Sequence, residues 1–430
     1  MKVAVLGLWH LGSVTAACLA SAGHSVRAFD PVPGTVAALA ASRPLVAEPG
    51  LPALIASGLR SGKLQFTSDL IRAVRDADVT WVTFDTPVDE DDVADVAYVE
   101  RQIEAAFPHL ADRSVVLSSS QLPVGTIRKL EHVWGQAAAG RTVSFACSPE
   151  NLRLGRAIEV FTNPDRVVVG VRDAHARARV QALLEPITDR IEWMSVESAE
   201  MTKHAVNAFL ATSVTFINEL AALCERVGAD AKEVERGLRT ERRIGPHAYV
   251  SPGGAFAGGT LARDVMFLRG LGSQVSRPTP LLDGVLASNT AHRLWARRRL
   301  ESDLGGLVGA RIAVWGLTYK PGTDTLRRSD AIELCRWLVS QGASVHVHDP
   351  AAPAVPDDVT VTRHEDPLAA AAGARALVVA TGWPAYREVD IDRLATLAPR
   401  LLVLDANQFL GAILANDTRF RFVAVGQPQK

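Results

Sequence analysis

The sequence has little net charge and few cysteines, and each shortage excludes a class of protein. Among its 430 residues, 46 lysines and arginines nearly balance 47 aspartates and glutamates, which leaves a formal net charge of −1. This balance gives no electrostatic basis for binding nucleic acid or an anionic membrane. The cysteines are far apart and lack metal-site spacing, so we expect no metal and a reduced, cytoplasmic protein; they are Cys18, Cys147, Cys224 and Cys335.

The sequence also shows no pattern typical of a signal peptide or a transmembrane segment. The chain opens with the strand-like run 2–6 rather than with the charged, apolar and cleavage regions of a signal peptide. No apolar run reaches the roughly 18 residues that cross a bilayer, so we expect no membrane partner. The hydrophobic content of 48% and the charged content of 22% are typical of a soluble globular protein, and the length predicts two or three domains.

Strands alternate with helices in the first part of the chain. The opening residues predict a strand over 2–6, a loop over 7–12, a helix over 13–22 and a second strand over 25–29. Further strand-like runs follow at 79–84, 114–118, 143–146 and 166–171. Alternating strands and helices predict a parallel, doubly wound sheet.

The middle of the chain has a different pattern. Residues 197–227 contain no proline or glycine and place apolar residues at helical spacing, which predicts one long, mostly buried helix. No strand pattern follows before residue 311. The α/β pattern then restarts, with a helix over 329–341 and strands over 311–317, 344–348, 376–380 and 401–404. The expected fold class is α/β, with two Rossmann-like doubly wound domains joined by a long central helix, and the expected domains are 1–195, 196–300 and 310–430.

The first loop has most of a dinucleotide-binding fingerprint. Gly7 and Gly12 lie between a strand and a helix, whose N-terminus can bind a pyrophosphate. Asp30 ends the second strand, where an acid can bond the ribose hydroxyls and repel a 2′-phosphate, so NAD is favoured over NADP. Trp9 occupies the place of the fingerprint's middle glycine. The residues expected to contact the cofactor here are Gly7, Trp9, His10, Leu11, Gly12 and Asp30.

Residues 253–264 read Gly-Gly-Ala-Phe-Ala-Gly-Gly-Thr-Leu-Ala-Arg-Asp. Glycine at this density is kept where the backbone must approach another group closely. The run resembles the active-site loop of the nucleotide-sugar dehydrogenases of the UDP-glucose/GDP-mannose dehydrogenase type, in which a cysteine is the nucleophile. Thr260 stands at the position of that cysteine, and Arg263 stands at the position of a lysine.

The resemblance continues in order from residue 1 to about residue 407. Further segments that carry it are 48–51, 85–87, 148–153, 164–166, 316–320, 323–324 and Arg327, with Lys203 and Asn207 on the central helix. Lys203 and Asn207 are four residues apart, so they share one face of that helix. In the segment 120–123, Gln121 replaces a cofactor-side threonine of the family.

The resemblance also implies roles for individual residues. The implied catalytic residues are Lys203, Asn207, Asp264 and Glu150, with Thr260 in the nucleophile's place. The implied further cofactor contacts are Thr86, Gln121, Arg263 and Arg327. The implied substrate contacts are Glu150, Asn151, Leu152, Lys203, Asn207, Tyr249, Gly253, Phe256, Gly258 and Lys320. The implied partners are a nucleotide sugar, with a UDP-hexose preferred, and a second copy of the chain, which forms a homodimer through the central helix.

The replacement of the cysteine leaves three activities open. In the family the cysteine adds to an aldehyde, so that a second oxidation can follow. The Thr260 hydroxyl is a weak nucleophile, and residues 253–264 include no histidine or deprotonable lysine. We expect NAD-dependent oxidation at C6 of a nucleotide sugar to a uronic acid, through a hydrated aldehyde. The alternatives are an alcohol dehydrogenase that stops at the aldehyde and a catalytically silent nucleotide-sugar-binding homologue.

Overall fold

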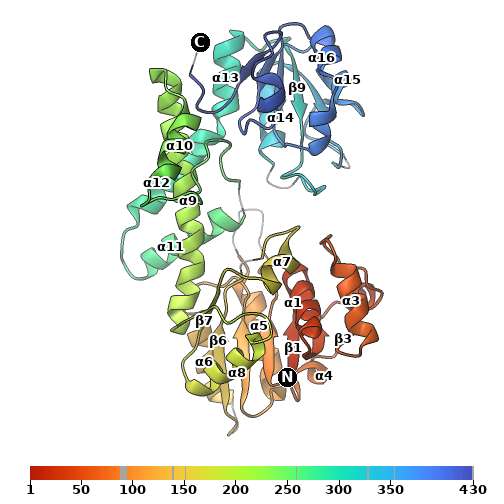
Figure 1. Ribbon diagram of the computed structural model, residues 1–430, viewed down its shortest axis with the longest axis vertical. Coiled ribbons are helices and arrows are strands. Elements are labelled where there is room, and N and C mark those ends of the chain that lie inside the picture. The colour runs from red at the N-terminus through yellow and green to blue at the C-terminus, as the bar shows by residue number, and fades with distance from the viewer. Residues whose placement is uncertain are drawn as a thin grey trace. The chain divides into compact units, whose positions relative to one another are not determined.

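The computed structural model describes residues 1–87, 94–137, 140–150, 152–257, 259–326, 329–352 and 354–428 (Figure 1). This part of the chain forms two compact units, residues 1–206 and 207–430. The expected domains 1–195, 196–300 and 310–430 stay a prediction, because the second unit holds both the central helices and the C-terminal sheet. Three expected site residues, Asn151, Gly258 and Arg327, lie outside the described residues.

An eight-stranded sheet forms the centre of the first unit, in the order β3-β2-β1-β4-β5-β6-β7-β8. The strands are β1 Lys2–Leu6, β2 Ser25–Phe29, β3 Leu64–Thr67, β4 Val79–Val82, β5 Ser114–Ser118, β6 Val143–Cys147, β7 Val167–Gly170 and β8 Ile191–Met194. Neighbouring strands are parallel except β6 and β7, which pair in opposite directions at Cys147 and Gly170. The expected parallel sheet is therefore confirmed except at this pair, where the connection carries only a six-residue helix.

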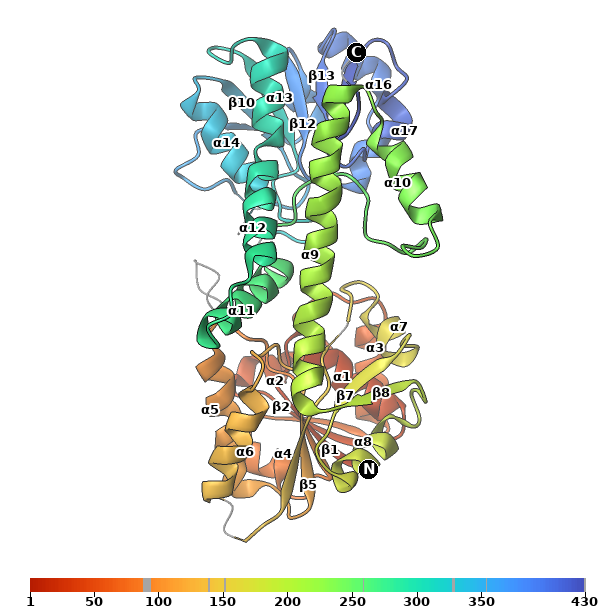
Figure 2. The same ribbon diagram turned by 90° about the vertical axis from the view of Figure 1, so that its left-hand side faces the viewer.

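Helices cover both faces of this sheet (Figure 2). They are α1 His10–Ser21, α2 Pro33–Ala40, α3 Leu51–Arg60, α4 Leu70–Val74, α5 Val96–Ala106, α6 Thr126–Ala137, α7 Ala157–Thr162 and α8 Ala174–Leu184, with a 3₁₀ helix over Phe107–His109. On β1, Val3 and Val5 join the core under α1, α3 and α8, whereas Ala4 and Leu6 join the core under α4, α5 and α6. Because β1 is buried on both faces, its sequence is continuously apolar.

Helix α1 begins at His10, three residues before the predicted start. Leu11 and Gly12 therefore lie in the helix rather than in the loop, and that part of the prediction was wrong. Gly7 has a left-handed φ of 92°, and its N–H donates to the backbone oxygen of Phe29 at 2.8 Å. A Cβ at Gly12 would lie 1.7 Å from the oxygen of Gly7. The helix can start this close to β1 only because residue 12 has no side chain.

The second unit combines long helices with a six-stranded sheet. Its helices before the sheet are α10 Ala231–Thr240, α11 Thr260–Gln274, α12 Pro280–Arg293 and α13 Trp295–Leu304. The strands are β9 Arg311–Trp315, β10 Ser344–His348, β11 Thr362–Arg363, β12 Ala376–Val379, β13 Leu402–Leu404 and β14 Arg421–Val423, and the helices between them are α14 Asp330–Ser340, α15 Pro367–Ala371, α16 Ile391–Leu397 and α17 Gly411–Leu414, with a 3₁₀ helix over Pro384–Glu388. The described residues between 207 and 310 contain no strand, as the sequence predicts.

The two sheets share one winding. The order β11-β10-β9-β12-β13-β14 repeats the order of the first six strands of the other sheet, so two doubly wound domains are confirmed. Gly316 follows β9 with a φ of 87°, as Gly7 follows β1, and donates to the oxygen of His348 at 2.8 Å. Asp349 ends β10 as Asp30 ends β2. Among the six donors to the Asp349 carboxylate are the N–H groups of Leu317 and Thr318.

Helix α9, Val196–Val227, belongs to both units, because the division between the units falls within it. The expectation that it is mostly buried is wrong: Phe209, Phe216 and Leu223 are 70%, 48% and 61% exposed. These side chains recur every seven residues and so share one face. By length and composition, α9 is long and apolar enough to cross a membrane, although its apolar residues do not form one uninterrupted run. The core helix of a soluble protein meets the same criteria.

We expect Gly12→Ala to destabilise the first unit severely, because the added methyl group would lie within 3 Å of Gly7 and of the Thr83 hydroxyl. The matched control is Gly34→Ala in α2, where nothing lies within 4 Å of the new methyl group. Alanine favours a helix by about 1 kcal/mol over glycine, so the control should keep or raise Tm. Thermal unfolding followed by circular dichroism compares the two, and a wild-type Tm for Gly12→Ala would contradict the packing argument.

Candidate functional site

The carboxyl edge of the first sheet carries the expected cofactor residues. Trp9 precedes α1, is 50% exposed and makes no capping hydrogen bond with its side chain. The first N–H groups of a helix have no partner within it, and they carry the positive end of the helix dipole. The start of α1, with His10, Leu11 and Gly12, therefore offers N–H groups to an anion such as a pyrophosphate.

Asp30 is placed to receive a ribose. Its carboxylate is 9% exposed, and its two oxygens accept hydrogen bonds from the N–H groups of Leu8, at 2.9 Å, and Val32, at 3.0 Å. A carboxylate oxygen has two lone pairs, so each oxygen keeps one for a ribose hydroxyl. These residues fit NAD.

The loops after β4 and β5 meet beside Gly7. The Thr83 hydroxyl donates to the oxygen of Gly7 at 2.8 Å, and the Thr86 hydroxyl donates to the backbone oxygen of Gln121 at 2.7 Å. This is the point where the strand order reverses, between β1 and β4, and open α/β sheets bind ligands at such points. The structure thus brings Thr86 and Gln121 together.

Lys203 and Glu150 also lie together in the first unit. The Lys203 ammonium donates to the backbone oxygen of Glu150 at 2.6 Å and lies 3.4 Å from its carboxylate. The two side chains are only 14% and 27% exposed, and this pairing meets the need of a largely buried charge for a partner. Leu152 packs against the core near them. The neighbouring His204 is 1% exposed and bonds the backbone oxygen of Leu122 at 2.9 Å, which is a structural contact.

Asn207 and Asp264 form a buried pair in the second unit. They are 7% and 0% exposed, and the Asn207 amide donates to the Asp264 carboxylate. Asp264 lies on α11 directly after Arg263, and Thr260 is the exposed first residue of that helix. The structure therefore places Thr260 at the positive end of a 15-residue helix.

Side chains from three elements hold the backbone of the glycine-rich loop. Asn218 on α9 accepts from the N–H of Gly253 at 3.0 Å and donates to the oxygen of Gly254 at 3.2 Å. Asn407, after β13, accepts from the N–H of Gly254 at 2.9 Å. A Cβ at Gly253 would lie 2.5 Å from the Asn407 oxygen. The lack of a side chain at Gly253 therefore allows Asn407 to lie close to the loop backbone.

Two residues of α12 complete the support of the loop. Asn289 accepts from the N–H of Phe256 at 3.0 Å and donates to its oxygen at 2.8 Å. The ring of His292 donates to the oxygen of Gly253 at 2.8 Å, and burial lowers the pKa of His292, so the ring stays neutral. Sequence reasoning missed Asn289 and His292 and gave Asn407 no role. The signal for Asn289 and His292 is a polar residue on the largely apolar helix α12.

Three expected substrate residues differ in how far their side chains are exposed. The Phe256 side chain is 9% exposed and packs in a core with Ala208, Ala211, Val265 and Val285, so it offers no free ring to a ligand. Tyr249 is 57% exposed. Lys320 is exposed beside Tyr319.

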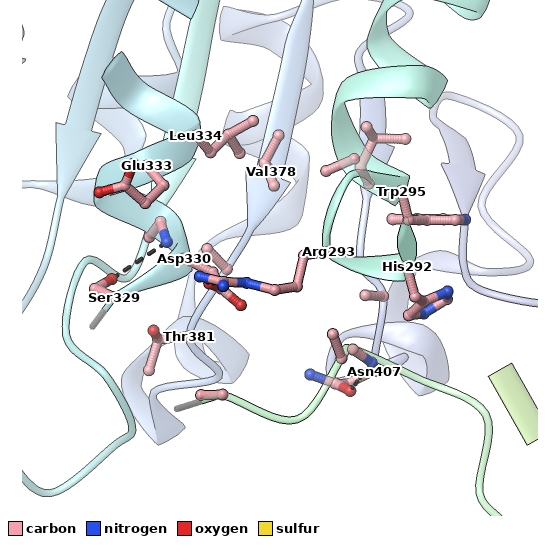
Figure 3. A pocket seen from close by; sticks show the side chains of 18 of the residues that line it. His292, Arg293, Trp295, Ser329, Asp330, Glu333, Leu334, Val378, Thr381 and Asn407 are labelled. Carbon is pink, nitrogen blue, oxygen red and sulfur yellow. Dashed lines mark hydrogen bonds and ion pairs between the residues drawn. The ribbon is translucent and has the colours of Figure 1, made fainter. Parts of the chain in front are cut away.

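A pocket of about 420 Å³ lies at the carboxyl edge of the second sheet (Figure 3). Its lining includes Gly254 of the glycine loop and residues at the ends of β9, β12 and β13, among them Thr318, Tyr319, Thr381 and Asn407. It covers the reversal of strand order between β9 and β12, where such sheets bind ligands. Arg293 crosses the pocket in Figure 3 and donates to Asp330 at 2.8 Å.

Family comparisons match along almost the whole chain. The models of the UDP-glucose/GDP-mannose dehydrogenase family match in order: the NAD binding domain over residues 1–188, the central domain over 197–291 and the UDP binding domain over 313–412. The chain belongs to this family. The resemblance seen in the sequence is therefore confirmed, with NAD as cofactor and an NAD-dependent nucleotide-sugar dehydrogenase as the class of enzyme.

Individual relatives match this chain over almost their full length. The chain is 33% identical to a UDP-glucose 6-dehydrogenase of Pseudomonas aeruginosa, over 100% of this chain and 98% of that protein. It is 34% identical to a UDP-glucose 6-dehydrogenase of Rhizobium meliloti, over 100% of both. The solved structure of a UDP-glucose dehydrogenase from Pyrobaculum islandicum superposes with a TM-score of 0.87 at 32% identity, over 99% of this chain and 97% of that one.

We expect Lys203→Ala and Asn207→Ala each to lower kcat by roughly 100-fold or more, because each removes a donor to a developing oxyanion. Asn207→Ala also leaves the buried Asp264 short of a donor, which costs about 1–3 kcal/mol. Circular dichroism and Tm separate the two effects. Asn163→Ala, which changes an exposed asparagine, is the control. A near-normal kcat in either variant would assign that residue to structure alone.

Proposed function

We propose that the chain oxidises C6 of a UDP-hexose, with UDP-glucose as the first candidate, to the uronic acid without a cysteine nucleophile. The observation that carries the proposal is the presence of two polar pairs, the partly buried Lys203 with Glu150 and the fully buried Asn207 with Asp264. A silent binding protein has no need of these pairs, since buried polar groups cost stability unless they are satisfied. The names of the relatives support the same substrate.

The first oxidation converts the C6 alcohol into an aldehyde. Lys203 has three N–H groups, and its contacts with Glu150 leave one for the substrate. Asn207 has two amide hydrogens, of which Asp264 takes one. Both residues can thus donate to the oxygen of the reacting alcohol as it loses its proton. NAD, when bound, supplies the hydride acceptor for each oxidation.

The second oxidation starts from the hydrate of the aldehyde. Water adds to the carbonyl carbon, and Glu150 or Asp264 accepts a proton from this water. The Thr260 hydroxyl bonds the hydrate, and the N-terminus of α11 stabilises negative charge on it. In total, one alcohol and one water yield one carboxylic acid, two hydrides and two protons.

We expect two NADH and a uronic acid per UDP-glucose consumed. Thr260→Val keeps the shape of the side chain but loses the hydroxyl, so it should keep the first oxidation and slow the second about tenfold, the effect of losing one hydrogen bond. Thr260→Ser is the matched variant and should keep both. NADH absorbance and product analysis measure the ratio.

Other outcomes identify the alternatives. One NADH per sugar together with a trappable aldehyde would mean that the enzyme stops at the alcohol dehydrogenase stage. A covalent sugar adduct on Thr260, found by mass spectrometry of stalled enzyme, would contradict the hydrate route. Binding of UDP-glucose without formation of NADH would identify the chain as the catalytically silent homologue.

We propose a homodimer through the exposed face of α9. Phe209, Phe216 and Leu223 lie along this face, and an exposed apolar stripe of this size is typical of an interface. Their seven-residue spacing suits packing against a second, equivalent helix.

We therefore expect wild-type protein to sediment as a dimer, and Phe216→Glu to sediment as a monomer, because it would bury a charge in the interface. The control is Val308→Glu, at a site that is 88% exposed and lies off this helix. Sedimentation velocity distinguishes the species. A monomeric wild-type protein, or a dimer that survives Phe216→Glu, would contradict this interface.

A further inference from the structure

Glu48 is a buried carboxylate that lies between two loops of the first unit. It precedes α3, its residue is 5% exposed, and its side chain is 1% exposed. Glutamates are almost never buried this deeply unless they are paired. The groups that surround Glu48 therefore show what its charge is for.

Three donors surround the Glu48 carboxylate. One oxygen accepts from His10 Nε2 at 2.9 Å and from the N–H of Gly155 at 2.8 Å. The other oxygen accepts from the N–H of Ala157 at 2.8 Å. Burial raises the pKa of Glu48, but these bonds outweigh burial and hold the pKa below its usual value, so the group is ionised at neutral pH.

The donors to Glu48 lie in two segments of the chain that are expected to bind different ligands. His10 is the first residue of α1, whose N-terminus is the expected site for the cofactor's pyrophosphate. Gly155 and Ala157 end the loop that starts at Glu150, the partner of Lys203. A carboxylate only accepts hydrogen bonds, so His10 donates from Nε2 and the orientation of its ring is fixed.

Capping of α7 alone does not explain this arrangement. Elsewhere in the chain, a local aspartate caps the helix that follows it, as Asp69, Asp173 and Asp230 do. Before α7 stands Arg156, which makes no such bond. The capping carboxylate comes instead from a residue more than 100 positions away, and it also accepts a hydrogen bond from His10 at the start of α1.

We propose that Glu48 is a positioning residue that couples the cofactor loop, residues 7–9 with His10 at the start of α1, to the substrate loop, residues 152–156 before α7, so that NAD and the nucleotide sugar strengthen each other's binding. The proposal rests on the proposed function for the second ligand. A ligand that orders one loop fixes the carboxylate, and the fixed carboxylate orders the other loop. By thermodynamic reciprocity, the coupling factor is the same in both directions.

The test measures the dissociation constant of NADH by fluorescence titration, with and without saturating UDP-glucose, a pair of ligands that does not react. Wild-type protein should bind NADH at least about fivefold more tightly with UDP-glucose present. Glu48→Gln and His10→Phe should reduce this ratio to within about twofold of one, since both remove the ion-assisted bond. His10→Gln can still donate and should restore part of the ratio.

Controls separate coupling from folding. Glu159→Gln changes an exposed glutamate of α7 that pairs with Arg156, and it should keep the wild-type ratio and Tm. His10→Phe leaves both backbone bonds to Glu48, so it tests the coupling even where Glu48→Gln does not fold.

Two results overturn the coupling. One is a wild-type ratio near one, and the other is an unchanged ratio in His10→Phe. If UDP-glucose does not bind the wild-type protein even with NADH present, the proposed substrate fails as well. If it binds but leaves the NADH affinity unchanged, the coupling alone fails.

Discussion

Close approach of bare backbone at the carboxyl edge of each sheet is the constraint on which this structure depends. A Cβ at Gly7 would lie 2.6 Å from Phe84, after β4, and a Cβ at Gly316 would lie 2.5 Å from Thr381, after β12. Both glycines have left-handed φ angles, which other residues adopt only with strain. These contacts draw the loops together where the strand order reverses, and so they position α1 and the pocket of the second sheet.

The glycine-rich loop is held in a different way. Among its described residues, Gly253, Gly254 and Phe256 bond amide and imidazole side chains of α9, α12 and the loop after β13. A loop supported from outside can exchange one of its own residues without losing its path.

The sequence predicts the helices and strands that have a regular pattern of apolar residues. It misses the features that depend on one tertiary contact. The strand over 2–6 has the predicted bounds, because its buried residues are continuously apolar. The edge strands β3, β8, β11 and β14 are not among the predicted strands, since at most one residue of each is buried and the apolar signal is weak. The early start of α1 depends on the space left by Gly12, which spacing alone does not reveal. Of the expected site, the pairing of Lys203 with Glu150 and of Asn207 with Asp264 joins residues distant in sequence, and only the resemblance grouped them.

Asp30 and Asp349 follow equivalent strands, but their carboxylates differ in how many hydrogen bonds they accept. Asp30 accepts two backbone bonds and keeps lone pairs for a ligand, whereas Asp349 accepts six bonds and is 4% exposed. An enzyme with two copies of one nucleotide fold risks self-inhibition, because its cofactor can enter the wrong copy. With its carboxylate saturated, the second copy has no acceptor at this position for a dinucleotide's ribose. The same position thus has lone pairs left for a ligand in the first unit, whereas in the second unit its carboxylate is taken up by bonds within the protein.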